Sequence, residues 1–143
     1  MTNSNVELGR LEVPVRWGDQ DAYGHLNNTV YFRFFEEARV NWLEQQGFGV
    51  RGQGESPVLI QCSATFLREI NYPAILIVTT LTEAIGSTSF TLGHQILSQD
   101  QTTVHCQGTA KLVWVNRDTG KSAPLPLELR AILEKGLSSR TGS

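Results

Sequence analysis

The segment from residue 27 to residue 47, NNTVYFRFFEEARVNWLEQQG, has an apolar surface too wide for a helix that faces water. At the 100° per residue of an α-helix, its apolar side chains form one broad stripe with a second strip beside it. Asn27 or Asn28 is placed to cap the N-terminus, and Gly47 to end the helix. Such a helix has to pack against a sheet or an interface. The stripe consists of Tyr31, Phe34, Phe35, Ala38 and Trp42, and the strip of Phe32, Val40 and Leu43.

Alternating apolar and polar residues predict strands on both sides of this helix. In residues 11–17 the alternation places Leu11, Val13, Val15 and Trp17 on one face, and Pro14 suits an edge strand or a strand start. Beyond a Gly-rich loop, the strand-like runs are 57–67, 74–85, 86–97 and 102–116. The first of these runs places Val58, Ile60, Cys62, Ala64 and Phe66 on one face, and the last places Val104, Cys106, Gly108, Ala110, Leu112 and Trp114 on one face.

The predicted order is strand, long helix, four strands and a short helix over residues 125–137, entered through Pro126. Short turns join the last three strands, so these are predicted to form an antiparallel meander. A five-stranded antiparallel sheet with one apolar helix on it is an α+β arrangement, and residues 1–143 make one domain. Charged residues make up 18% of the chain, where about 25% is usual, which suggests that a subunit interface replaces polar surface. We therefore expect a homo-oligomer.

Composition excludes several classes of function. A net charge of -2 argues against a general nucleic-acid binder, because binding to phosphates needs a basic face. No apolar run approaches the roughly 18 residues needed to span a membrane, and residues 1–10 have no hydrophobic signal core. The expected location is the cytoplasm, where Cys62 and Cys106 are predicted to be buried, reduced thiols.

The loop WGDQDAYGHLNN, residues 17–28, lies between the first strand and the helix, and it carries the residues best suited to chemistry. Free amides and a positive partial charge at a helix N-terminus bind an anion, or stabilise one that forms in a reaction. A nearby carboxylate, Asp19 or Asp21, is able to act as a nucleophile or a general base. These are the minimal parts for transfer of an acyl group to water. The alternative is a solvated loop with ordinary helix-capping residues.

Other reactive residues show no comparable pattern. His94 and His105 fall on opposite faces of different strands, without metal-ligand spacing, so no metal site is predicted. Ser63 lacks the GxSxG surroundings of a serine hydrolase. Neither GxGxxG nor GxxxxGK[ST] is present, so nucleotide-binding folds have no support.

The stretch VRWGDQDAYGHLNNTVYFRFFEEARVNWLEQQG, residues 15–47, resembles the signature of the hotdog-fold acyl-CoA thioesterases, in the 4-hydroxybenzoyl-CoA thioesterase family. The shared features are a strand, then D-x-D-x-x-G-H-[VL]-N-N, then an aromatic helix with FEEAR. The resemblance implies a curved antiparallel sheet wrapped around a long central helix. It also implies hydrolysis of an acyl-CoA or acyl-carrier-protein thioester, with no cofactor because CoA is part of the substrate. Beyond residue 57 the likeness is one of pattern more than of residues.

The resemblance also implies roles for particular residues. Asp21 matches the catalytic carboxylate, which attacks the thioester carbonyl or activates a water. Asn28 matches the residue whose backbone N–H polarises that carbonyl, and His25 matches a histidine that orients substrate or water in many relatives. Asp19 is expected to shape the loop. Because the site of this family lies between subunits, the residues expected to bind substrate are Tyr31, Ser63, Thr65 and Arg68, with Arg68 or Arg51 as candidates for the CoA phosphates.

Three alternatives remain open from the sequence. Another thioesterase branch of the fold uses a glutamate on the central helix, which would be Glu36 or Glu37, although Glu37 is placed to pair with Arg33 as an ordinary surface acid. A hotdog hydratase or dehydratase usually carries D-x-N-P-x-H, and no Asn-Pro follows Asp21. A non-catalytic protein that binds acyl-CoA or an acyl-carrier protein is the third, because fold does not fix function.

Overall fold

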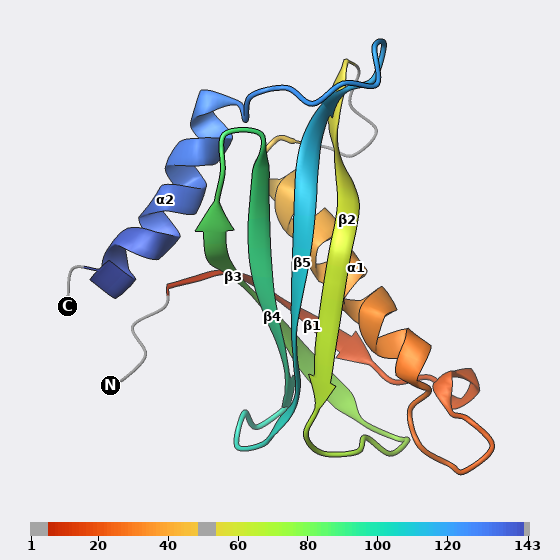
Figure 1. The fold of residues 1–143 in the computed structure, drawn as a ribbon. Helices are drawn as coiled ribbons and strands as arrows, with labels where there is room; N and C mark the ends of the chain where they lie inside the picture. The colour runs from red at the N-terminus through yellow and green to blue at the C-terminus, as the bar shows by residue number, and fades with distance from the viewer. Residues whose placement is uncertain (1–5, 49–53, 142–143) are drawn as a thin grey trace.

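The computed structural model describes residues 6–48 and 54–141, and its element order is the one predicted (Figure 1). A long helix lies behind an antiparallel sheet. The elements are β1 (Glu7–Pro14), a 3-10 turn (Trp17–Asp19), α1 (Asn28–Gln45), β2 (Glu55–Phe66), β3 (Ile75–Ile85), β4 (Ser89–Ser98), β5 (Val104–Asn116) and α2 (Leu127–Thr141).

The five strands form one sheet in the order β1-β3-β4-β5-β2, and every neighbouring pair is antiparallel. The predicted meander of the last three strands is therefore confirmed. The two strands that precede it in the chain, β1 and β2, lie at opposite edges of the sheet. Pro14 is the last residue of edge strand β1, where a missing N–H costs no ladder hydrogen bond.

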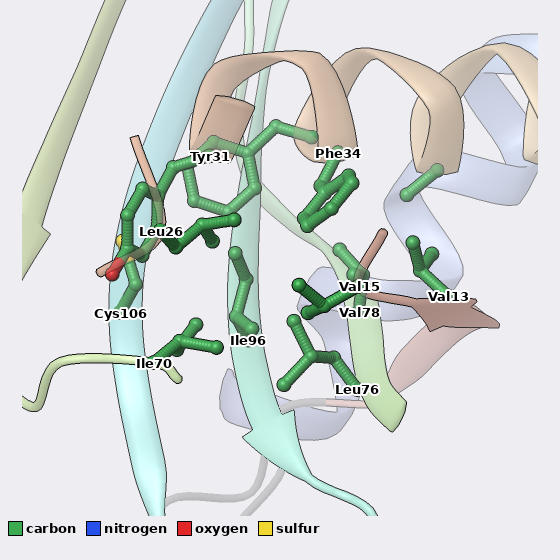
Figure 2. Packing of buried hydrophobic residues seen from close by; sticks show 12 residues of the cluster. Val13, Val15, Leu26, Tyr31, Phe34, Ile70, Leu76, Val78, Ile96 and Cys106 are labelled. Atoms are coloured by element: carbon green, nitrogen blue, oxygen red, sulfur yellow. The ribbon is translucent and has the colours of Figure 1, made fainter. Parts of the chain in front are cut away.

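Helix α1 packs its predicted aromatic stripe onto one face of the sheet, and every member of that stripe is buried. Asn27 is the N-cap, and Gly47, with φ of 90°, lies just beyond the helix end, so both predicted signals are confirmed. Figure 2 shows Tyr31 and Phe34 above Leu76, Val78 and Ile96 of the sheet. This packing fixes the N-terminal half of α1, and with it the position of the loop that precedes the helix.

A second apolar cluster covers the other half of the same sheet face. Leu129 and Leu133 of α2 pack there with Trp42 and Leu43 at the end of α1. Both helices therefore lie on one face of the sheet, called here the inner face. Among the described residues, no helix is both long enough and apolar enough to cross a membrane.

The predicted strand over residues 11–17 is displaced in the structure. β1 begins at Glu7 and ends at Pro14, and Trp17 starts the 3-10 turn with 74% of its surface exposed. The prediction that Trp17 shares the inward face of Val13 and Val15 is wrong, because the chain leaves the sheet after Pro14. The inward positions of Val13 and Val15 are confirmed, since both are buried.

A β-bulge on β2 changes which of its side chains face inward. The pairing register shifts between Leu59 and Gln61, so Leu59, not Val58, lies opposite inward-facing Leu112. The predicted alternation is correct for the residues after the bulge and wrong before it, because one extra residue reverses the facing. Cys62 is exposed, contrary to prediction, because β2 is an edge strand, while Cys106 on β5 is buried as predicted.

Candidate active site

The loop between β1 and α1 is closed on itself by short-range hydrogen bonds. An isolated antiparallel bridge joins Gln20 to Leu26, and the amide N–H of Asp21 donates to the carbonyl of His25 at 2.8 Å. Gly24 turns the chain with φ of 80°, a conformation that glycine adopts at little cost. The loop thus holds the Asp21 and His25 backbones in a fixed relation.

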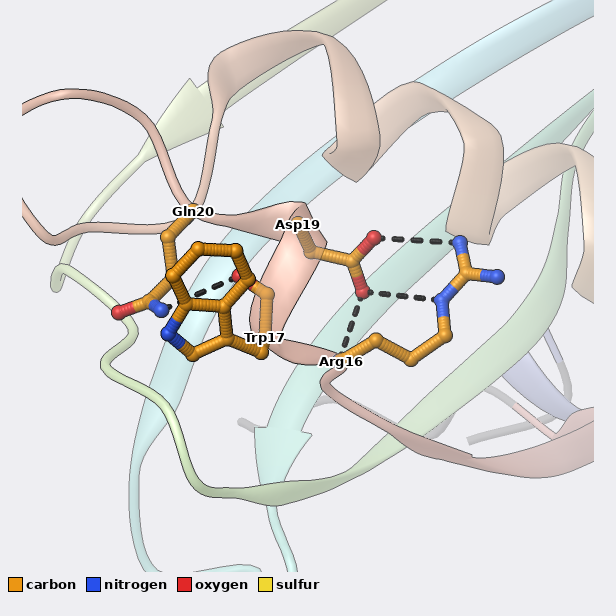
Figure 3. Close-up of polar contacts among 4 residues, drawn as sticks. All are labelled: Arg16, Trp17, Asp19 and Gln20. Carbon is orange, nitrogen blue, oxygen red and sulfur yellow. Dashed lines mark hydrogen bonds and ion pairs between the residues drawn. The ribbon is translucent and has the colours of Figure 1, made fainter.

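Asp19 is a structural residue of this loop (Figure 3). Its carboxylate accepts hydrogen bonds from the backbone N–H of Arg16 at 2.8 Å and from the Arg16 guanidinium at 3.1 and 3.4 Å. Burial acts to raise the pKa of Asp19, but the hydrogen bonds and charge of Arg16 outweigh it and hold the pKa below its ordinary value. The Asp19 carbonyl also accepts from the amide of Asn27, which ties the turn to the start of α1. Both carboxylate oxygens are engaged, in agreement with the expected loop-shaping role.

Asp21 is held differently, because only one of its carboxylate oxygens is engaged. Oδ1 accepts from the backbone N–H of Tyr23 at 2.8 Å and of His25 at 3.2 Å. Within residues 6–48 and 54–141, Oδ2 makes no hydrogen bond or ion pair. The two acids of the DxD motif therefore differ in kind: the first is saturated with donors, and the second is oriented by the loop with one oxygen left open.

The first turn of α1 presents a single unpaired amide. The side chain of Asn27 accepts from the backbone N–H of Thr29 at 3.0 Å, and the Asn27 carbonyl accepts from Val30 at 2.9 Å. The N–H of Asn28 has no acceptor in the described part of the chain. Because the macrodipole places partial positive charge here, this N–H is suited to a carbonyl oxygen that gains negative charge.

His25 is held by the loop after β2, a segment that no sequence pattern connects with it. Its Nδ1 lies 3.0 Å from Oδ1 of Asn71 and 3.1 Å from Oε2 of Glu69. In the same loop, which follows β2, the carbonyl of Ile70 accepts a hydrogen bond from the backbone N–H of Leu26 at 2.9 Å. Sequence reasoning missed Glu69 and Asn71, because no spacing rule links residues more than forty positions apart in two loops.

Tyr31 lies at the junction of the loop and the core. It is buried, and its ring meets that of Phe66 edge-on at 4.7 Å between centroids. Burial raises the pKa of its phenol, and the charges of Glu69 and Asp21 contribute in the same direction. Tyr31 therefore lies within electrostatic range of both Glu69 and Asp21.

A groove of about 260 Å³ runs along α1 beside the edge strand β2. It starts at Thr29, one residue after Asn28, and continues past Glu36 to Arg39, with Leu59 and Cys62 of β2 as its opposite wall. Asp21 does not line it. Within one chain, therefore, the groove reaches the helix N-terminus without including the motif carboxylate.

The remaining predicted substrate residues are spread over two regions. Ser63 and Thr65 alternate with the inward Cys62 and Ala64, so they lie on the outer face of the sheet, where Ser63 bonds Thr109 at 2.7 Å. They line a separate polar hollow of about 410 Å³. Arg68 is exposed and its backbone pairs with His105, next to the segment that holds His25. Arg51 lies outside the described residues.

The helix glutamates and the remaining histidines are placed as follows. Glu36 and Glu37 are both exposed, and Glu37 makes no ion pair with Arg33 in the described chain, so that predicted pair is not formed. His94 is buried on the inner face, and His105 lies on the opposite face, as predicted. The described residues contain no cluster of three potential metal ligands.

Known proteins resemble this chain over most of its length. Residues 15–133 match the model of the Thioesterase-like superfamily. The PA2801 protein of Pseudomonas aeruginosa is 38% identical, with a TM-score of 0.84 over 88% of this chain and 98% of that one. A structure of the thioesterase superfamily from Jannaschia sp. CCS1 is 31% identical, with a TM-score of 0.79 over 85% and 78% of the two chains. The 1,4-dihydroxy-2-naphthoyl-CoA hydrolase of Synechococcus sp. WH7803 is 28% identical over 92% of each chain.

The antiparallel sheet wrapped around α1, together with these relatives, defines a hotdog-fold thioester hydrolase. The chain belongs to the Thioesterase-like superfamily.

Proposed function

We propose that this protein hydrolyses an acyl-CoA thioester to the free acid and CoA, with Asp21 as the reacting carboxylate and the backbone N–H of Asn28 as the oxyanion donor. The observation that carries this proposal is that the loop before α1 leaves one carboxylate oxygen of Asp21 open, while the first amide of that helix, at Asn28, has no acceptor. A thioester carbonyl that accepts from the Asn28 N–H becomes more electrophilic, and its developing negative charge is stabilised there.

The chemistry then follows one of two routes. In the first, Asp21 removes a proton from a water as that water attacks the carbonyl, and collapse of the tetrahedral intermediate releases CoA thiolate, which is then protonated. In the second, Asp21 attacks the carbonyl itself, CoA leaves, and water hydrolyses the resulting acyl anhydride. His25, held through Nδ1 by the loop after β2, keeps Nε2 available to orient water or substrate. Neither route needs a cofactor.

The substrate class is supported by the kind of thioester that a relative hydrolyses. The Synechococcus relative, by name, acts on 1,4-dihydroxy-2-naphthoyl-CoA, an aromatic acyl-CoA with hydroxyl groups. The aromatic side chains of Tyr31, Phe32 and Phe35 lie near the α1 start and the groove. We propose acyl-CoA, in preference to an acyl-carrier protein, as the donor of the acyl group.

A second copy of the chain is part of the proposal, because one chain does not bring all the predicted residues together. Asp21 is absent from the lining of the groove, and the edge strand β2 exposes Val58, Leu59 and Ile60 at 45%, 41% and 56%. An unpaired strand edge with apolar side chains is usually covered. We propose that β2 pairs with a second copy, whose surface closes the groove next to the motif loop.

The proposal is tested by following the ultraviolet absorbance of the thioester bond with a panel of acyl-CoAs. Thiol reagents are less suitable, because the exposed Cys62 would react with them. Asp21→Asn is expected to lower kcat by about 10²- to 10⁴-fold on any substrate that the wild type hydrolyses. Asp118→Asn, which removes a carboxylate from an exposed turn, is the matched control.

Three outcomes would change the assignment. If Asp21→Asn keeps its activity and Glu36→Gln loses it, the groove-lining glutamate is the catalytic carboxylate. If acyl-CoAs bind and none is hydrolysed, the protein is a binding module. If a β-hydroxyacyl-CoA gains a double bond, which is also visible in the ultraviolet, the protein is a dehydratase.

A further inference from the structure

The groove contains a buried cation that the proposed reaction does not use. Arg39, on the fourth turn of α1, is 7% exposed and lines the groove together with Glu36 and Cys62. Within residues 6–48 and 54–141 its guanidinium makes no hydrogen bond and no ion pair. Five N–H donors therefore meet no protein acceptor, although the side chain is largely buried and lines the groove.

An unpaired buried guanidinium is costly, and the structure around it does little to offset the cost. Burial lowers the pKa of Arg39, and the charge of Glu36 one turn earlier opposes this without forming an ion pair. Behind the groove, Nε2 of His94 is also buried without a partner. Arg39 disfavours a proton on His94, so the two groups do not satisfy each other while both are charged.

The groove places this cation at a definite distance from the reaction centre. Thr29 and Arg39, which both line the groove, are ten residues apart, which corresponds to about 15 Å of helix rise. Side chains on a helix lean toward its N-terminus, so the guanidinium lies closer than this to the carbonyl that the Asn28 N–H would polarise. The span is too long for an acetyl group and suits an extended acyl chain or a fused aromatic ring.

We propose that Arg39 is a specificity-determining residue, which selects acyl groups that carry an acceptor oxygen, above all a carboxylate, at the end distant from the thioester. This inference rests on the proposed function and adds the chemistry of the substrate. A guanidinium is well matched to a carboxylate because it forms two parallel hydrogen bonds. A substrate with an apolar end leaves the guanidinium unpaired in a closed groove.

The charges around the groove favour an acyl group that ends in a carboxylate. Arg33 and Glu36 also line it, so with Arg39 the lining carries two cations and one anion. An acyl group with one terminal negative charge therefore balances the lining, and a cationic acyl group would not.

The first test uses the wild-type protein and pairs of substrates matched in length. Suberoyl-CoA, ω-hydroxyoctanoyl-CoA and octanoyl-CoA differ only at the distant end of the acyl chain. We expect kcat/KM to be at least about tenfold higher for suberoyl-CoA than for octanoyl-CoA. The hydroxy compound separates a requirement for charge from a requirement for any acceptor oxygen. Equal values for all three, or a preference for octanoyl-CoA, would overturn the proposal.

The second test changes the cation. Arg39→Met keeps much of the side-chain volume without the charge, and Arg39→Lys keeps the charge without the planar fork. Arg39→Met is expected to remove the preference for suberoyl-CoA. Its KM for suberoyl-CoA should rise, and its kcat/KM for octanoyl-CoA should change little. Arg39→Lys is expected to restore part of it. Equal losses on both substrates would assign Arg39 to folding alone, which a thermal melt of each variant checks independently.

A binding measurement separates this proposal from the proposed function. Cys62 lies on the groove wall, so a ligand in the groove is expected to slow its alkylation by iodoacetamide. The probes are the non-hydrolysable thioethers of suberoyl- and octanoyl-CoA. Stronger protection by the carboxylate probe in the wild type, and equal protection in Arg39→Met, supports the role of Arg39 even if no thioester is hydrolysed. No difference between the probes in the wild type would reject it.

Discussion

Two hydrogen bonds join Asp21 and His25, because the N–H of Asp21 donates to the carbonyl of His25 at 2.8 Å and the N–H of His25 donates to the side-chain Oδ1 of Asp21 at 3.2 Å. The second bond orients the carboxylate with the same residue that the loop after β2 holds through Asn71. The position of the proposed catalytic acid is therefore determined from two sides of the chain.

The role of the Asn28 amide is testable by removing the N–H itself. Asn28 is the first residue of α1, a position that accepts proline, and Asn27 before it has φ of -63° and ψ of 134°, as a residue before proline requires. We expect Asn28→Pro to fold and to lose about 10²- to 10³-fold in kcat, with a smaller change in KM. Asn28→Ala, which keeps the N–H, is expected to lie far closer to the wild type in kcat. Similar kinetics for Asn28→Pro and Asn28→Ala would show that this amide is not the oxyanion donor.

The close approach of α1 to β5 requires glycine at position 108. A Cβ there would lie 2.5 Å from Cε2 of Phe35 and 2.6 Å from the carbonyl oxygen of Ser63. Because one of these contacts is backbone, Gly108→Ala is expected to lower the free energy of unfolding by about 1 to 3 kcal/mol in chemical denaturation. Gly18→Ala, whose Cβ would meet nothing within 4 Å, is the matched control. Equal stability of the two variants would contradict this packing.

Buried His94 predicts a pH dependence of stability. Burial lowers its pKa in the folded protein to about 4, against 6.5 for the free side chain. The unfolded chain therefore binds a proton first, and stability present above about pH 6.5 is lost as the pH falls toward 4. The loss is expected to reach about 3 kcal/mol, and His94→Leu is expected to flatten the profile in this range. The control Ile96→Val should lower stability by a similar amount at every pH, and a slope retained by His94→Leu would assign the effect elsewhere.

The edge of β2 predicts the state of association. Ile60, at the bulge, is 56% exposed, and a lysine at such an edge opposes pairing with another strand. We expect the wild type to sediment as a dimer or larger, and Ile60→Lys to shift toward a monomer with lower activity. Leu127→Lys on α2, at a position 82% exposed, is the control for added charge. A monomeric wild type, or an Ile60→Lys variant that associates normally, would refute the proposed interface.

Local patterns were sufficient for much of this fold. The α1 stripe, its cap and the strand order in the chain follow from periodicity and turn residues, which act over a few positions. The bulge after Leu59 was not predictable, because Val58, Leu59 and Ile60 are all apolar and fit either register of the alternation. The exposure of Cys62 depends on which strand lies at the edge, which is a property of the whole sheet.

The candidate site likewise has features that local sequence predicts and features that depend on distant segments. The different environments of Asp19 and Asp21 arise from Arg16, three residues away from Asp19, and so lie within reach of local reasoning. The contact of His25 with Glu69 and the burial of Arg39 arise from packing between distant segments. No spacing of residues in the sequence predicts either of them.

Edge strand β2 runs directly into the segment that carries Glu69 and Asn71, and these residues hold the imidazole of His25. If another copy adds its own strand along β2, the contact ends only a few residues from the reacting groups. Turnover per chain would then depend on how concentrated the protein is, and dilution alone would act as an inhibitor.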